Sequence, residues 1–254
     1  MVVKQAVYGF LLAVQFLTRI PVPFQCPWNK YTSRWAIRSY PLVGAVLGFI
    51  ITIIYMLLES SLPLPIMTLL IISLWVWITG GLHLDGWMDV ADAVGSNASL
   101  ERKWEIMKDS HVGSFGIIAL LFLLAWKILL IYFLLESGIP IYFFILILCF
   151  SRLGAVVLMI FLPTAKQQGL AWEWKKNVNR YDCLYAMIPV LALLFFFNDF
   201  LYFLPGYILF IGLFGAWVFR TFKGTNGDLL GTAIEGGELW GLAITWIYFS
   251  FVIV

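Results

Sequence analysis

The sequence predicts an all-α, polytopic integral membrane protein: a helical bundle of about seven transmembrane helices preceded by a short amino-terminal interfacial or re-entrant helix. Of its 254 residues, 62% are hydrophobic and only 12% are charged, whereas an ordinary globular domain is about 25% charged. The mean hydropathy is +0.94, and several apolar runs approach the roughly 20 residues that a helix needs to cross a bilayer. We therefore treat residues 1–254 as a single integral membrane domain.

The elements follow in order along the chain. The first apolar run, 7–17, is too short to cross a bilayer, and the charges of Lys4 and Arg19 on either side of it favour a helix with both ends on one membrane face. A cleaved signal peptide is disfavoured because no small-residue cleavage site follows. The remaining long apolar runs are predicted spans, at roughly 38–58, 64–82, 114–135, 140–162, 183–199, 204–220 and 237–254.

The distribution of Lys and Arg predicts the orientation. The loops 59–63, 136–139 and 200–203 contain neither residue, whereas the loops on the alternate side hold nearly all of them. Short basic loops stay cytoplasmic, so we expect a cytoplasmic amino terminus and, with seven spans, a carboxyl terminus on the outside. Only Lys127 and Arg152 fall inside predicted spans.

Charge and cysteine usage exclude several classes of function. The net charge of +2 reflects the basic loops and favours the lipid bilayer, not nucleic acid, as the partner. Cys26, Cys149 and Cys183 are far apart in the sequence, so neither a disulfide framework nor a zinc site is indicated.

Three carboxylates follow directly on the apolar run 64–82. Asp85, Asp89 and Asp92 are spaced by four and three residues, which places them within roughly a 60° arc of one helix face. Like charges so close repel one another, and a divalent cation with hard oxygen ligands, most often Mg²⁺ together with phosphate, relieves that repulsion. The alternative is a solvated acidic helix start, which the helix dipole would favour. We prefer a metal and phosphate site because three acids share the face and glycines flank them.

Two further segments carry polar residues that suit phosphate. Lys108 and Ser110 precede Gly113, which opens the next predicted span with N–H groups that attract anions. Lys166 follows a later span and could reach a ligand, or it could be an ordinary cytoplasmic lysine. Arg152 could bind phosphate in bidentate fashion or pair with a buried carboxylate such as Asp109 or Glu235, and the sequence leaves both open.

The last basic loop leads into a Gly-rich segment, 224–237, which we expect on the cytoplasmic side. Asp228 and Glu235 are seven residues apart, again on one helix face, as Asp85 and Asp92 are. Carboxylates from two segments could hold one Mg²⁺ ion or two, the usual apparatus of phosphoryl displacement. His83 is expected to be a packing residue, since Mg²⁺ gives imidazole little reason to coordinate.

These motifs together resemble the cobalamin synthase family, the adenosylcobinamide-GDP ribazoletransferases. The resemblance runs nearly end to end and rests on the segments 16–23 (FLTRIPVP), 40–44 (YPLVG), 81–86 (GLHLDG) with Asp89 and Asp92, 108–110 (KDS) with Gly113, 151–152 (SR), and 227–228 (GD) with Glu235. His111, Ala93 and Asn226 depart from the pattern, in which Arg, Gly and Thr are usual.

The resemblance implies a Mg²⁺-dependent transfer, in the cell membrane, of the adenosylcobinamide phosphoryl group. The donor would be adenosylcobinamide-GDP, the acceptor α-ribazole or α-ribazole 5′-phosphate, and the products adenosylcobalamin or its 5′-phosphate and GMP. A further conjecture is that membrane attachment keeps the chain near other late corrinoid-pathway enzymes.

Roles for individual residues follow as hypotheses. Asp85, Asp89, Asp92 and Asp228 would hold Mg²⁺. Lys108, Arg152 and Lys166, with Ser110 and Gly113, would bind substrate, and Lys108 would also steady charge during the reaction. Asp92 or Glu235 would accept the ribazole hydroxyl proton.

Two other classes of function stay open from the residues alone. A phosphotransferase that uses CDP-activated alcohols would also place spaced Asp residues at a membrane edge, but its Asp-Gly-x-x-Ala-Arg pattern is absent, since residues 85–89 read DGWMD. A transporter would show paired broken spans and midplane charges, whereas most of the charge here is expected at one edge.

Overall fold

The computed structural model describes residues 2–165 and 167–252, most of which lie in helices. In chain order these are α1 (Val2–Leu17), α2 (Lys30–Leu58), α3 (Leu64–Thr79), α4 (Leu82–Gly95), α5 (Leu100–Ile106), α6 (Ser114–Glu136), α7 (Phe143–Phe161), α8 (Leu170–Lys175), α9 (Arg180–Phe196), the 3₁₀ turn η1 (Asn198–Phe200), α10 (Phe203–Phe222) and α11 (Gly227–Phe251). Each predicted span overlaps a helix in the described residues, although α3 and α9, with 16 and 17 residues, are shorter than a membrane span needs, and the predicted amino-terminal helix is α1. The prediction of a polytopic helical membrane protein is confirmed.

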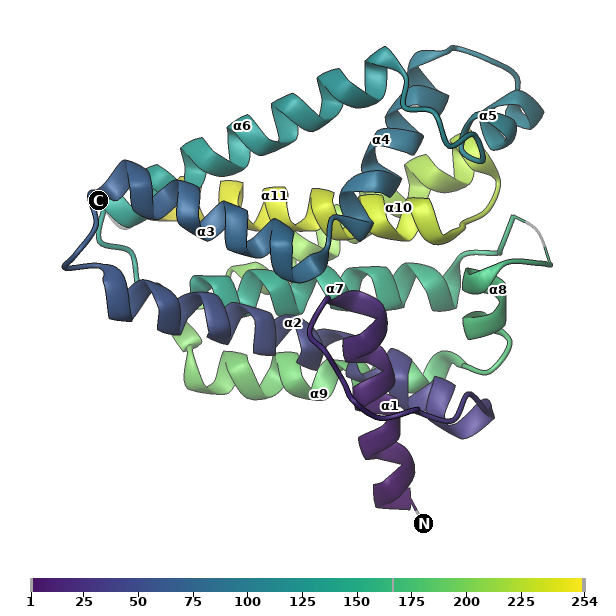
Figure 1. The fold of residues 1–254 in the computed structure, drawn as a ribbon, viewed down its shortest axis with the longest axis horizontal. Helices are drawn as coiled ribbons and strands as arrows, with labels where there is room; N and C mark the ends of the chain where they lie inside the picture. Colours follow the sequence, from purple (N-terminus) through teal and green to yellow (C-terminus); the bar gives the residue numbers. More distant parts are fainter. Residues whose placement is uncertain (1, 166, 253–254) are drawn as a thin grey trace.

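The long helices run along the longest axis of the molecule, whereas α1 and α4 cross that direction (Figure 1). Helix α7 lies in the middle, packed against α2 on one side and α11 on the other, and most of its residues are buried. Small residues let the backbones approach closely: a Cβ on Gly44 of α2 would lie 2.1 Å from the carbonyl oxygen of Leu148. This central layer fixes where α11 can lie.

Four of the described helices are each long and apolar enough to cross a membrane, namely α2, α6, α7 and α10. Helices α3 and α4 meet the same test only as a pair, and they are bent by 89°. Gly80 and Gly81 make the bend, because their φ angles of 67° and 70° lie in the left-handed region. We take α3 as the crossing part and α4 as a helix turned along one end of the bundle. The predicted span 64–82 therefore ends early, at Thr79.

Helix α11 begins well before the predicted span 237–254. Asn226 caps it by accepting the N–H of Leu229 at 3.0 Å, and the helix then continues through the Gly-rich segment to Phe251. Glycine lowers helix propensity, so the sequence favoured a loop here, but packing against α4 and α7 overrides that preference. Glu235 consequently lies inside the bundle and not in an edge loop.

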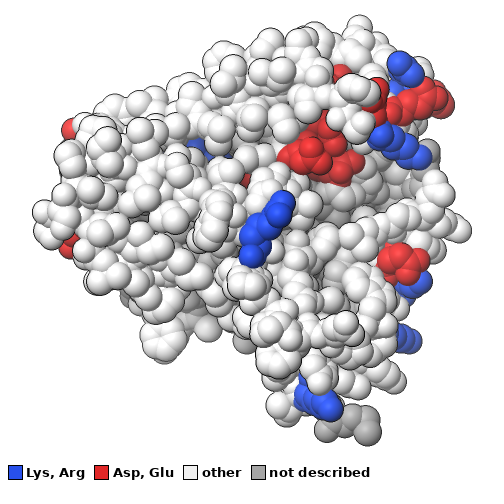
Figure 2. Space-filling model, viewed as in Figure 1, with Lys and Arg blue, Asp and Glu red and all other residues white. Residues whose placement is uncertain are grey.

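Charge is distributed unevenly over the molecule. On the face drawn in Figure 2, most Lys and Arg side chains lie toward the end that holds α5 and α8 in Figure 1, and the opposite end of that face shows none. We call the first end, which also holds the 223–226 link between α10 and α11, the basic end. Helix α4 and the start of α11 meet there.

Candidate active site

The contact between α4 and α11 brings acids from distant parts of the chain together. A Cβ on Gly86 would lie 2.7 Å from the carbonyl oxygen of Asp228, so the two backbones touch at a position that only glycine permits. Thr232 strengthens the contact by donating its hydroxyl to the carbonyl oxygen of Gly86 at 3.0 Å. Asp228 thus lies beside α4, as expected if acids from the two segments form one site, whereas Glu235, predicted on the same helix face, is buried inside the bundle.

Four carboxylates interact electrostatically at this junction. Partial burial, followed by the negative charges of Asp85, Asp228 and Asp92, raises the pKa of Asp89 to about 7. In the described part of the chain none of the four enters an ion pair. In that part no group of three acidic, His or Cys side chains is arranged so that it could hold a metal ion by itself. The acids are neighbours without a cationic partner, and phosphate or water oxygens would have to complete the ligands of a divalent cation bound there.

Asp92 differs from the other three because its oxygens are already engaged. They accept the backbone N–H of Gly113 at 2.8 Å and of Gly116 at 2.9 Å, which caps the start of α6. A Cβ on Gly113 would lie 2.3 Å from Asp92 Oδ1, so the glycine makes room for this carboxylate. The anion-attracting helix start predicted from the sequence exists, but its anion in this structure is Asp92.

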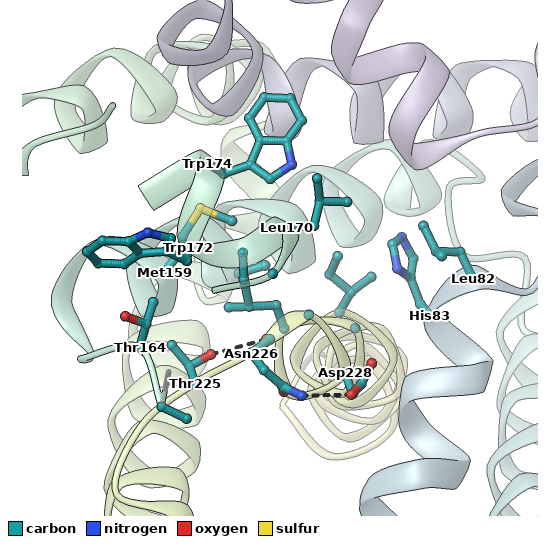
Figure 3. Close-up of a pocket in the computed structure, with 18 of the residues that line it drawn as sticks. Leu82, His83, Met159, Thr164, Leu170, Trp172, Trp174, Thr225, Asn226 and Asp228 are labelled. Atoms are coloured by element: carbon teal, nitrogen blue, oxygen red, sulfur yellow. Dashed lines mark hydrogen bonds between the residues drawn. The ribbon is translucent and has the colours of Figure 1, made fainter. Parts of the chain in front are cut away.

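A cavity of about 560 Å³ opens beside the acids. Asp85, Asp228 and the exposed Lys108 line it, with Asn226 donating its amide to Asp228 at 2.7 Å (Figure 3). The rim is held by paired loops, since Thr225 donates its N–H to the carbonyl oxygen of Pro163 at 2.8 Å. The rest of the lining is largely apolar and aromatic, and includes Phe16, Leu17, Tyr40, Leu82, Met159, Leu170, Trp172, Trp174, Leu230 and Ile234.

A second set of charges lies inside the bundle and does not line this cavity. Lys127 is 2% exposed and donates to Glu235 and to Glu238, at 2.5 Å each. Arg152 is fully buried and hydrogen-bonds Glu238, which also accepts the indole N–H of Trp75 at 3.2 Å. We call Lys127, Arg152, Glu235 and Glu238 the buried ion cluster.

The buried ion cluster changes the interpretation of two predicted site residues. Of the two alternatives for Arg152, the structure shows pairing with a buried carboxylate, and the partner is Glu238. Glu235, a candidate base, is 4% exposed and bonded to Lys127. Charged groups inside a membrane bundle are costly unless they pair, so we interpret these four residues as a structural network that joins α6, α7 and α11.

The remaining predicted residues lie around the α5–α6 loop and the α7–α8 loop. Ser110 is exposed and is not among the residues that line the cavity. Asp109 accepts the backbone N–H of His111 at 3.0 Å, and the ring nitrogen Nδ1 of His111 lies 2.7 Å from the same carboxylate oxygen. Asp109 therefore does not pair with Arg152. Lys166 lies outside the described residues.

Sequence reasoning missed Glu238 and most of the cavity wall. Glu238 could have been found, because a second acid three residues after Glu235 in an apolar helix needs a cationic partner, and Lys127 and Arg152 were the available cations. Trp174 and Tyr40 gave no such signal, since aromatic residues in an apolar chain are usually packing residues.

Comparison with known proteins identifies the family of the chain. Residues 9–246 match the family described as cobalamin-5-phosphate synthase. The adenosylcobinamide-GDP ribazoletransferase of a Geobacillus species is 38% identical over 261 residues, covering 99% of this chain and 100% of the relative. The enzyme of that name from Halalkalibacterium halodurans is 36% identical, covering 97% of this chain and 98% of the relative. The enzyme from Vibrio cholerae is 34% identical, covering 91% of this chain and 90% of the relative. No solved structure matches the chain.

Proposed function

The chain belongs to the cobalamin-5-phosphate synthase family, and on that premise we propose that it transfers the adenosylcobinamide phosphoryl group from adenosylcobinamide-GDP to α-ribazole or α-ribazole 5′-phosphate. The ribose hydroxyl oxygen forms a bond to the phosphorus that carries cobinamide. The bond from that phosphorus to the bridging pyrophosphate oxygen breaks, and GMP leaves with that oxygen. The observation that carries the assignment is the meeting of unpaired acids from α4 and α11 beside Lys108 at one cavity.

The acids at this junction suit Mg²⁺. Asp85, Asp89 and Asp228 have no cationic partner in the described part of the chain, and burial, followed by the charges of the neighbouring carboxylates, raises the pKa of Asp89. We assign the metal to these three carboxylates. When bound, the metal would supply neutralisation of the negative charge on the pyrophosphate oxygens. Asp92, predicted as a fourth ligand, would instead hold α6 against α4.

Other residues of the cavity have roles that follow from their positions. Lys108 is the cation that lines the cavity near the acids, and we assign it to a non-bridging phosphate oxygen. The two bases suggested by the sequence, Asp92 and Glu235, are each bonded elsewhere and do not line the cavity. Asp85 and Asp228 do line it but are assigned to the metal, so we expect the hydroxyl proton to leave to solvent in the cavity.

The chain is a membrane protein, and we infer that its basic end faces the cytoplasm. This inference is supported by the loops 59–63 and 136–139, which lack Lys and Arg and join helices at the opposite end (Figure 1). Both substrates would then be met from the cytoplasmic side of the cell membrane.

The test is product analysis with purified protein in detergent. We expect GMP to form only when adenosylcobinamide-GDP, α-ribazole and Mg²⁺ are all present, and Asp85→Asn to reduce GMP formation at least a hundredfold. Asp109→Asn is the matched control, because it changes an exposed aspartate at the same end of the molecule. GMP formation without α-ribazole would overturn the proposal. Turnover of a CDP-alcohol in place of adenosylcobinamide-GDP would also overturn it.

A further inference from the structure

Three buried polar atoms around the main cavity have no hydrogen-bond partner in the described part of the chain. They are the hydroxyl of Tyr40, the indole Nε1 of Trp174 and the imidazole Nε2 of His83. Their residues are 2%, 1% and 4% exposed, so solvent does not satisfy these atoms from outside the cavity. Buried polar atoms are nearly always paired in folded proteins. Three unpaired atoms around one cavity indicate a ligand that pairs with them.

Tyr40 and Trp174 lie together, with ring centroids 6.3 Å apart, whereas His83 is on α4, two residues before Asp85. In Figure 3 the indole of Trp174 lies across the cavity from Asp228, and the imidazole of His83 lies at its side. Neighbouring rings hold Trp174 in place, with ring centroids of Phe16 at 5.6 Å and Trp28 at 4.4 Å. Because Trp174 is 1% exposed, it offers no open stacking surface, and its unpaired N–H is the group left to pair with a ligand.

The size and chemistry of the cavity limit what it can bind. Ligand pockets of about 300–1,000 Å³ hold drug-sized molecules, mostly against apolar side chains with a few placed polar groups. At about 560 Å³ the cavity suits a nucleoside and is small for a corrin macrocycle with its side chains. The lining of the cavity is largely apolar, and Leu170 lies between Trp174 and His83 in Figure 3.

We propose, building on the proposed function, that Tyr40, Trp174 and His83 form the subsite for the acceptor nucleoside, α-ribazole. The base of α-ribazole is an apolar benzimidazole with one unsubstituted ring nitrogen, an acceptor that suits a single N–H donor in an apolar wall. The ribose hydroxyls supply the donors and acceptors for the remaining two atoms. With the base on this wall, the ribose lies between it and Asp85 and Asp228, where the attacking hydroxyl is needed.

Guanosine, the nucleoside of the leaving GMP, fits this wall less well. Guanine has donors and acceptors along several edges, and an apolar wall with three polar atoms would leave some of them buried and unpaired. The corrinoid donor is then placed on the open, acidic side of the cavity.

The experiment is calorimetric titration of the purified full-length protein with α-ribazole alone, without the corrinoid donor. Tyr40→Phe and Trp174→Phe each remove one polar atom and keep an aromatic ring, and we expect about tenfold weaker binding for each, the effect of one hydrogen bond. The matched controls are Tyr202→Phe and Trp87→Phe, which make the same changes at buried polar atoms outside this cavity. We expect both controls to bind α-ribazole as the wild type does.

The outcomes separate this inference from the proposed function. Absence of GMP formation by the wild type would refute the proposed function. The titration instead measures the affinity for α-ribazole, which tests the subsite without the reaction. Wild-type affinity for α-ribazole in both wall variants would overturn the subsite, as would weaker binding of adenosylcobinamide-GDP with α-ribazole binding unchanged. Tyr40 and Trp174 lie on separate helices, so either variant carries the test if the other fails to fold.

Discussion

Replacing Lys127 by Met tests how the bundle tolerates its internal charges. Lys127 is 2% exposed and bridges Glu235 and Glu238, at 2.5 Å from each. The substitution keeps the length of the side chain but removes the cation. Two buried carboxylates then share one cation, Arg152, and a net negative charge remains in the core.

The expected cost follows from burial. Removing one partner of a buried ion pair typically costs about 3–5 kcal/mol, because the other charge stays buried without compensation. For a chain of this size each kcal/mol corresponds to roughly 2–4 °C in melting temperature. We therefore expect the apparent Tm of the detergent-purified Lys127→Met protein to fall by about 6–20 °C, measured by intrinsic fluorescence during heating.

A second substitution makes this prediction specific. Adding Glu235→Gln to Lys127→Met removes the stranded carboxylate and leaves the pair between Arg152 and Glu238 intact, so we expect at least half of the lost Tm to return. Glu105→Gln breaks an exposed ion pair and should leave the Tm unchanged. An undiminished Tm in the single variant, or a double variant less stable than the single one, would refute the reasoning.

Two further predictions concern the acidic junction. Gly86→Ala forces a Cβ to within 2.7 Å of the Asp228 backbone, so we expect α4 and α11 to separate and the apparent Tm to fall by roughly 2–12 °C. The control is Gly212→Ala, where a Cβ meets nothing within 4 Å. Equal Tm values for the two variants would contradict the prediction. Because burial and neighbouring carboxylates raise the pKa of Asp89 to about 7, protons compete with Mg²⁺ below that pH. The Mg²⁺ concentration for half-maximal GMP formation should rise about tenfold as the pH falls from about 8 to about 6. It should vary less with pH in Asp89→Asn. A pH-independent value in the wild type would contradict the coupling between protonation of Asp89 and Mg²⁺ binding.

The helical bundle was predictable because its signal is long and repeated. Apolar runs near the length of a membrane span occur throughout the chain, and all of them fall on helices. The start of α11 was not predictable in the same way, since glycines disfavour a helix locally and only contact with α4 and α7 justifies one there. The bend at Gly80 and Gly81 was missed for a related reason: adjacent glycines permit a left-handed turn but do not require it.

The acidic junction was partly predictable. Helical spacing correctly placed Asp85, Asp89 and Asp92 near one another, and the pKa of Asp89 shows that Asp228 belongs with them. Spacing could not show that Asp92 caps α6, because its partners, Gly113 and Gly116, are more than twenty residues away. The roles of buried groups depend on which helices meet, and that information is tertiary.

Divalent-cation binding at the junction of α4 and α11 is the central claim, and it is measured most directly without substrates. Mn²⁺ bound to the purified protein can be titrated by electron paramagnetic resonance, with Mg²⁺ as competitor. We expect saturable Mn²⁺ binding that weakens at least tenfold in a variant carrying both Asp85→Asn and Asp89→Asn, and that is retained in Asp109→Asn. Equal Mn²⁺ affinity in the wild type and the double variant would contradict the account.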